Sequence, residues 1–200
     1  HELVHSAHVP IAALPGLLHV ADPYQTQAMQ DMQQRLSQVP VRDPRTSVPF
    51  KVGLSLTCSS LHSTETYPQS RRSCDPAQLA PLARLPEAHC FHIQKDPFPA
   101  GAALWGERWH ELGEELRDFV DTAAWVNTMD VVVTVDSVLA HVAGLLGKPT
   151  CLLLPYVSDW RWQLAPQTNP WYPSVTLYRQ PRVGDWTSVF EAVAQDLSAT

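Results

Sequence analysis

The sequence predicts an α/β domain in which helices cover both faces of a parallel β-sheet, and the middle of the chain carries the strongest pattern. Residues 131–135 form an unbroken β-branched run, which suits a strand that is buried on both faces. A largely apolar helix is expected over 137–146, where Gly147 and Pro149 then end it. A second apolar strand over 150–154 follows at once. This order of strand, helix and strand is typical of a Rossmann-like fold.

The rest of the chain alternates in the same way. Three further short strands, which bring the expected number to five, are predicted over residues 51–56, 88–94 and 174–178. Three further helices are predicted over residues 76–85, 121–129 and 185–197. We expect Asp75 to cap the first of these helices and Asp121 to begin the second. Residues 111–118 are expected to hold a short strand or a turn, and the whole Rossmann-like domain to occupy 49–200.

Residues 1–48 differ from that domain and are predicted to be the remnant of a preceding one. Polar helix formers occupy 25–38, and the prolines that follow indicate a linker. The first five residues match the H-E-x-x-H pattern of zinc proteases literally. That chemistry needs the motif inside a stable helix, and Pro10 breaks any continuation of one here. We therefore favour irregular, packed chain over a metal site.

Composition and charge exclude several classes of function. The 200-residue chain has a formal net charge of −6 and its basic residues are scattered, which argues against a nucleic-acid partner. No apolar run reaches the roughly 20 residues that span a bilayer, and no signal peptide opens the chain. The four cysteines lack C-x-x-C spacing and are typical of unpaired thiols in a reducing compartment. We therefore expect a soluble, cytoplasmic protein without a membrane span.

The carboxyl end of the central strand is the first candidate binding site, because ligands sit at that edge of open α/β sheets. Asp136 and Ser137 lie where the strand passes into the helix, and His141 points back toward the helix N-terminus. The free N–H groups of that terminus favour an anion such as a diphosphate. The alternative is an ordinary cap at Asp136, whose carboxylate would compete for the same N–H groups, and a satisfied core histidine.

Trp160, Arg161 and Trp162 follow the strand over 150–154 and form the second candidate. A guanidinium binds phosphate through two parallel hydrogen bonds, and an aromatic ring can pack on a base or a sugar. The alternative is that one tryptophan belongs to the core and that Arg161 makes a surface ion pair, since alternating residues of a loop cannot all contact a ligand.

Basic residues near two other strands are weaker candidates. Lys95 follows the strand over 88–94 and is a second candidate phosphate contact, although a lone lysine is usually solvated. Arg71 and Arg72 lie in a long polar loop over 58–73, which either closes over the site or carries a solvated charge pair.

Long stretches of the sequence also resemble a known family. The stretches DFVDTAAWVNTMDVVVTVDSVLAHVAGLLGKP, LLLPYVSDWRW and NPWYPSVTLYRQPRVGDW are similar to the glycosyltransferase domain found behind tetratricopeptide repeats in bacterial proteins. That domain belongs with the heptosyltransferase-like glycosyltransferases of family 9, which have the GT-B fold. The resemblance is strong from about residue 118 to the end and traceable from residue 51.

The resemblance implies the C-terminal half of a GT-B glycosyltransferase, which binds a nucleoside-diphosphate sugar such as an ADP-heptose-like donor. The sugar would pass to a saccharide or protein acceptor. The acceptor site and the catalytic base would lie on a missing N-terminal half, and a tetratricopeptide-repeat region is a further expected partner. No metal or other cofactor is implied, since the helix dipole and basic side chains offset the charge of the leaving group.

The family pattern assigns roles to particular residues. Asp136, Ser137 and His141 match its Asp-Thr-Ser-x-Ala-His diphosphate site, while Val138 replaces a hydroxyl residue. The implied roles of the other candidates are neutralisation of the leaving group by Arg161 and Lys95 and packing of Trp160 or Trp162 on the donor.

One departure from the family supports an alternative function. The Trp-x-Gly-Asn-Pro segment that the family carries after its first strand is replaced here by residues 55–60, SLTCSS. The alternative is therefore a degenerate, non-catalytic GT-B-like domain that retains the fold for interaction.

Overall fold

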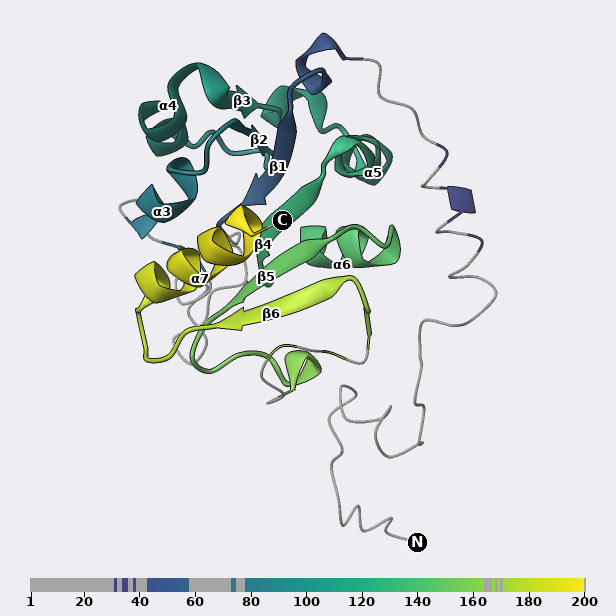
Figure 1. Cartoon of the computed structure of the whole chain (residues 1–200). Helices are drawn as coiled ribbons and strands as arrows, with labels where there is room; N and C mark the ends of the chain where they lie inside the picture. Colours follow the sequence, from purple (N-terminus) through teal and green to yellow (C-terminus); the bar gives the residue numbers. More distant parts are fainter. Residues whose placement is uncertain are drawn as a thin grey trace, which may run out of the picture.

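The structure, a computed structural model, describes residues 31, 34, 35, 38, 43–57, 73–74, 78–163, 167, 169 and 171–199. These residues form one six-stranded sheet flanked by helices (Figure 1). The architecture confirms the predicted α/β, Rossmann-like fold class. The strands are β1 (Phe50–Ser55), β2 (Ala88–His92), β3 (Trp109–Glu111), β4 (Val131–Val135), β5 (Thr150–Leu154) and β6 (Val175–Arg179).

The order of the strands determines where a ligand can bind. They run β3-β2-β1-β4-β5-β6, and every neighbouring pair is parallel. The chain builds outward from β1 through β2 to β3, returns to the middle at β4, and then builds outward on the other side. The order therefore reverses between β1 and β4, and the crevice beyond the carboxyl ends of strands at such a switch point is where open α/β sheets bind ligands.

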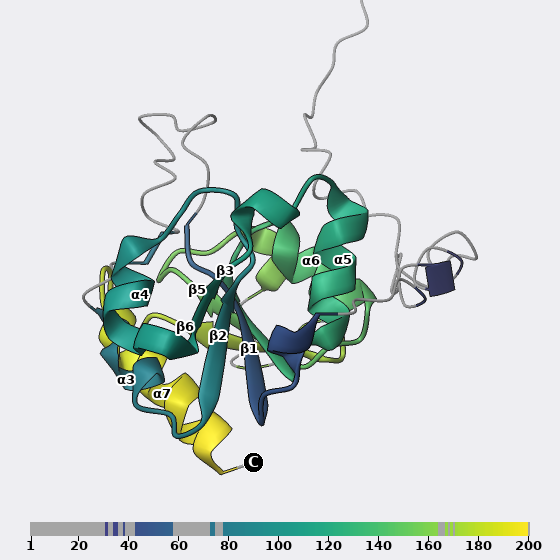
Figure 2. The ribbon, with the colours of Figure 1, turned by 90° about the horizontal axis from the view of Figure 1, so that it is seen from above.

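Five α-helices of the described residues cover the two faces of the sheet (Figure 2). One face carries α3 (Ala80–Ala83), α4 (Pro99–Trp105) and α7 (Trp186–Ser198), and the other carries α5 (Phe119–Thr128) and α6 (Val138–Leu145). Strand β4 contributes side chains to both layers: Val133 packs among the side chains of the first face and Val132 among those of the second. Burial on both faces explains why this strand is β-branched throughout.

Two elements differ from the sequence-based expectation. The sheet has a sixth strand, β3, which ends where the predicted strand or turn over 111–118 begins, and helix α4 precedes it. Helix α4 has the sequence PAGAALW, whose small residues give no clear apolar stripe. Gly101 is required there, because a Cβ atom at this position would lie 2.3 Å from the Trp109 ring.

The caps of two helices also correct the expectation. Helix α5 begins at Phe119 rather than Asp121, because the Asp118 carboxylate accepts hydrogen bonds from the N–H groups of Val120 and Asp121 at 2.8 and 3.0 Å. The cap of α6 is Ser137 rather than Asp136.

The end of α6 forms as predicted, but Lys148 acts on a different helix. Gly147 has a φ of 67°, the left-handed conformation that ends many helices. In the sequence Lys148 lies just after the C-terminus of α6, where a cation interacts favourably with the helix dipole. Its Nζ atom instead donates to the carbonyl oxygens of Asn127 and Met129, at 2.6 and 3.2 Å, and so stabilises the C-terminal end of α5.

Several expectations concern residues outside the described ones. These include the H-E-x-x-H segment, the predicted cap Asp75, and Arg71 and Arg72 in the long polar loop. Of the predicted helix over 25–38, residues 31, 34, 35 and 38 are described; the first three are helical and residue 38 lies in a turn. Within the described residues, no helix combines the length and the apolar character needed to cross a membrane.

Candidate functional site

The candidate site lies at the carboxyl edge of the sheet, where β1 and β4 end side by side. Ser55 and Thr134 are paired across these strands, and the polypeptide leaves β4 through Asp136 and Ser137 into helix α6. The sequence therefore placed the first candidate group at the topological switch point. Among the described residues, no group of three or more His, Cys, Asp or Glu side chains could hold a metal ion there or elsewhere.

Ser137 organises the N-terminus of α6. Its hydroxyl oxygen accepts from the N–H group of Leu139 at 3.3 Å and lies 3.1 Å from the hydroxyl of Thr134, which donates to the Val135 carbonyl oxygen. Asp136 is buried, with 3% of its surface exposed, and its carboxylate is not the helix cap. The alternative of an ordinary cap at Asp136 is therefore wrong, because Ser137 takes that position.

His141 is the most tightly positioned of the candidate residues. Its Nδ1 atom lies 3.0 Å from the Tyr172 hydroxyl, and its ring stacks on Trp162 at 5.5 Å with an angle of 26°. Burial lowers the pKa of His141, and the nearby Arg161 lowers it further, against opposing effects of Asp136 and Asp159. The imidazole is therefore neutral near pH 7. When Nδ1 accepts from Tyr172, the proton lies on Nε2, which is then a donor for a ligand.

Tyr172 reaches His141 because two other residues make room for it and hold its backbone. The side-chain oxygen of Asn169 accepts from the N–H groups of Trp171 and Tyr172, at 3.1 and 2.9 Å, and its nitrogen donates to the Val175 carbonyl oxygen at 2.9 Å. Gly144 of α6 lies beneath the ring, since a Cβ atom there would be 2.4 Å from the Tyr172 Cγ atom. Sequence reasoning missed this support because the three residues have no common periodicity.

The two tryptophans of the second candidate have different environments. Trp162 is 0% exposed and packs with Leu152, Leu154 and Tyr172. The predicted packing of Trp160 or Trp162 on the donor therefore stays a prediction for Trp160, because the Trp162 ring has no accessible face. The contact of Trp162 with His141 is a supporting one. Trp160 is 44% exposed and keeps a ring available. The alternative in which one tryptophan is core thus holds for Trp162.

Arg161 lies beside this cluster in the short 3-10 helix Trp160–Trp162. Its guanidinium stacks on the Trp160 ring at 5.9 Å and pairs with the Asp159 carboxylate at 3.3 Å. Within the described residues, its buried Nε atom has no hydrogen-bond partner, which leaves a donor unused. The partly exposed pair of Arg161 and Asp159 agrees in part with the predicted surface ion pair. The guanidinium still has N–H groups that could bind an anion.

Two further residues shape this edge and were not predicted. Arg179 of β6 donates to the Gln163 carbonyl oxygen at 2.6 Å and to the Ser158 hydroxyl, so it anchors both ends of the turn that carries Arg161. Gln94 follows β2, and its side-chain oxygen accepts from the N–H groups of Leu56 and Thr57, both at 3.3 Å.

Lys95 lies on the same edge but not beside His141. It follows β2, which is separated from β4 by β1, and its side chain is exposed. The structure therefore brings together Asp136, Ser137, His141 and Arg161 and leaves Lys95 at a neighbouring position.

Comparisons with known proteins bear on this arrangement. No family model matches the sequence. Over 92 residues the chain is 32% identical to Protein FlbA of Caulobacter vibrioides, a match that covers 46% of this chain and 15% of that protein. The E. coli ADP-heptose LPS heptosyltransferase II has a similar structure, with a TM-score of 0.55 and 15% identity, over 87% of this chain and 51% of that one. The chain has a glycosyltransferase-like fold.

Both matches cover only part of the other protein. The chain spans about half of the heptosyltransferase, and it aligns with only 15% of FlbA. At 15% identity the structural match is a likeness of fold.

Proposed function

We propose that this chain is the donor-binding part of a glycosyltransferase and corresponds to the C-terminal half of a GT-B enzyme. The donor is a nucleoside-diphosphate sugar of the ADP-heptose type, and the acceptor is a saccharide or a protein. The observation that carries the proposal is the neutral His141, held by Tyr172 and Trp162 one turn inside a helix that begins at the switch point of the sheet.

The proposed chemistry of the site follows from its donors. Transfer breaks the bond between the anomeric carbon and the diphosphate oxygen, so negative charge grows on the leaving group. The N-terminus of α6 and the Ser137 hydroxyl would hold the diphosphate, and a neutral His141 would donate a hydrogen bond to it. Arg161, with Lys95 as a more distant cation, would offset the growing charge, and Trp160 would pack on the donor. The charge of Asp136 opposes the lowering of the His141 pKa that burial causes.

No residue of this chain is assigned as the catalytic base. We expect the base that deprotonates the acceptor on the other half of the enzyme, and a tetratricopeptide-repeat region as a further partner. The site needs no metal in this scheme, because backbone dipoles and the guanidinium supply the positive charge.

The test is thermal stability in the presence of ADP, UDP, GDP or CMP. One nucleotide at about 100 times its dissociation constant should stabilise the fold by roughly 2.7 kcal/mol. His141→Ala should abolish the effect. His89→Ala is the matched control, because His89 lies near the amino end of β2, away from the carboxyl edge. A shift that survives in His141→Ala would place the nucleotide elsewhere.

A non-catalytic binding domain is the second candidate. It is favoured by the turn after β1, where Gln94 binds the backbone of Leu56 and Thr57 and the Gly-Asn-Pro turn of the resembled family is absent. The absence of a shift with any nucleotide, in a folded chain, would select this candidate.

A further inference from the structure

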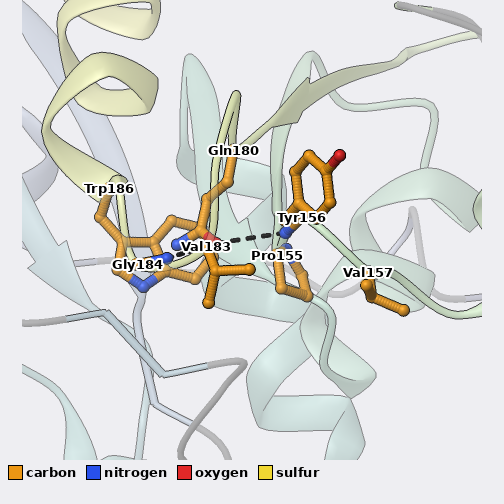
Figure 3. Close-up of a pocket in the computed structure, with 7 residues that line it drawn as sticks. All are labelled: Pro155, Tyr156, Val157, Gln180, Val183, Gly184 and Trp186. Atoms are coloured by element: carbon orange, nitrogen blue, oxygen red, sulfur yellow. Dashed lines mark hydrogen bonds between the residues drawn. The ribbon is translucent and has the colours of Figure 1, made fainter.

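A cavity opens at the same edge of the sheet, beyond β5 and β6 and beside the start of helix α7. Its volume is about 180 Å³, and Tyr156 and Val157 line one side while Val183 and Trp186 line the other (Figure 3). Gln180 lies between these walls (Figure 3). The proposed function makes no use of this pocket.

The Gln180 side chain has a fixed orientation and an unused donor. Its oxygen accepts from the backbone N–H groups of Tyr156 and Gly184, both at 3.2 Å. Because both neighbours are donors, the oxygen must face them and the NH₂ group must face the other way. Gln180 is 4% exposed, and within the described residues its Nε2 atom has no hydrogen-bond partner. A buried donor without a partner is destabilising, and a ligand acceptor would relieve that cost.

The chemistry of the walls restricts the ligand. None of the described residues that line the pocket is charged, so a charged group would lose its hydration without compensation. Its volume suits a small planar group rather than a whole nucleotide, since a cavity of about 150 Å³ holds a benzene molecule. A nucleobase presents several donors and acceptors along its edges, whereas the described lining offers one buried donor without a partner, the Gln180 NH₂ group. A secondary amide needs only that donor for its carbonyl oxygen, because its single N–H group can face the solvent at the pocket opening. The match is a planar, uncharged group with one carbonyl acceptor beside apolar atoms.

We propose that this pocket binds an amide group of the acceptor, with the amide carbonyl accepting from Gln180 Nε2 and its methyl or methylene group packed between Val157 and Trp186. The acetamido group of an N-acetylated sugar and the acetylated side chain of a protein lysine share this chemistry. The Gln180 nitrogen is closed off from solvent, so binding requires a small shift of the adjoining turn, whose residue Val183 is 77% exposed. Only the role of the amide as part of an acceptor rests on the proposed function.

The experiment is an NMR titration of the ¹⁵N-labelled 200-residue chain, in which the side-chain NH₂ signals of Gln180 are followed. N-acetylglucosamine should move these signals if the source is a sugar, and free Nε-acetyllysine should move them if the source is a protein. Glucose and unmodified lysine are the matched ligands without the amide and should leave them in place. Gln180→Glu retains an oxygen for both backbone N–H groups and removes the NH₂ donor. Its affinity, followed through the indole N–H signal of Trp186 in the same pocket, should fall at least about tenfold. Gln195→Glu, an exposed position on α7, is the control for the same chemical change.

The outcomes separate this proposal from the one for the donor. Val183→Trp should block the pocket while leaving Gln180 intact, which gives a second test if Gln180→Glu fails to fold. Equal shifts with glucose and N-acetylglucosamine, or no shift with either acetylated compound, would overturn the amide pocket. A response of the Gln180 signals to ADP alone would replace it by a nucleotide site. If ADP moves the signals of His141 but not those of Gln180, the result concerns the donor site only.

Discussion

Substitution of Gly144 by alanine tests whether the helix α6 glycine exists to admit Tyr172. Glycine inside a helix is less favourable than alanine by about 0.8–1.0 kcal/mol, so on helix propensity alone Gly144→Ala should stabilise the protein. In this structure the added Cβ atom would lie 2.4, 2.6 and 2.8 Å from Cγ, Cδ1 and Cδ2 of the Tyr172 ring. Relief to ordinary contact requires the ring to move by about 1 Å, and overpacking of this kind typically costs about 1–3 kcal/mol.

The same movement should break the hydrogen bond to His141. The Tyr172 hydroxyl lies 3.0 Å from Nδ1, so an additional 1 Å takes it beyond hydrogen-bonding range, at a further cost of about 0.5–1.5 kcal/mol. Once the propensity gain is subtracted, we therefore expect Gly144→Ala to lower the free energy of unfolding by a net amount of about 0.5–3.5 kcal/mol, as measured by urea denaturation. In a Tyr172→Ala background the clash is absent, and Gly144→Ala should then be neutral or stabilising. A stabilising effect of Gly144→Ala in the parent chain would refute the reasoning.

Two further predictions concern a helix cap and a histidine. Asp118→Ala removes the acceptor of two N–H groups at the start of α5 and should lower the free energy of unfolding by about 1 kcal/mol. Asp118→Asn keeps an acceptor oxygen and should retain most of the stability. Equal losses in both variants would show that charge rather than capping matters. The lowered pKa of His141 means that the unfolded chain binds its proton more readily, so the stability from this group is present above pH 6.5 and lost as the pH falls through the folded-state pKa. The slope of the unfolding free energy against pH between 7 and 5 should therefore be smaller in His141→Ala. Part of the slope remains, because burial also lowers the pKa values of His89 and His110. An unchanged slope would contradict the prediction.

The centre of the fold could be predicted because short-range patterns determine it. The β-branched run of β4 and the left-handed Gly147 before Pro149 are local features, and each has one common structural meaning. The edge of the sheet could not be predicted in the same way. Helix α4 consists of small residues that fit under Trp109, and β3 is only three residues long, so neither leaves a periodic pattern.

The place of the candidate site in the fold could be predicted from the sequence, but the contacts of its residues only in part. Asp136, Ser137 and His141 share one strand-to-helix junction, which a sequence pattern can locate. The partner of His141 is 31 residues further along the chain, and no local rule connects His141 to Tyr172. Similarly, the buried Trp162 and the exposed Trp160 flank one residue in a loop without periodicity, so their environments follow from tertiary packing alone.

The anchoring of the Trp160–Trp162 turn by Arg179 ties the candidate site to an edge strand of the sheet. Strand β6 is the last in the strand order and pairs only with β5 in the described sheet. Strands at such an edge open in local fluctuations that leave the central strands intact. Each opening of β6 would break the contacts of Arg179 with Ser158 and Gln163, and the turn that carries Arg161 would then no longer be held in place. In hydrogen exchange the backbone amide of Arg161 would therefore exchange together with those of the edge strand β6. The backbone amide of His141 would exchange slowly, with those of the core.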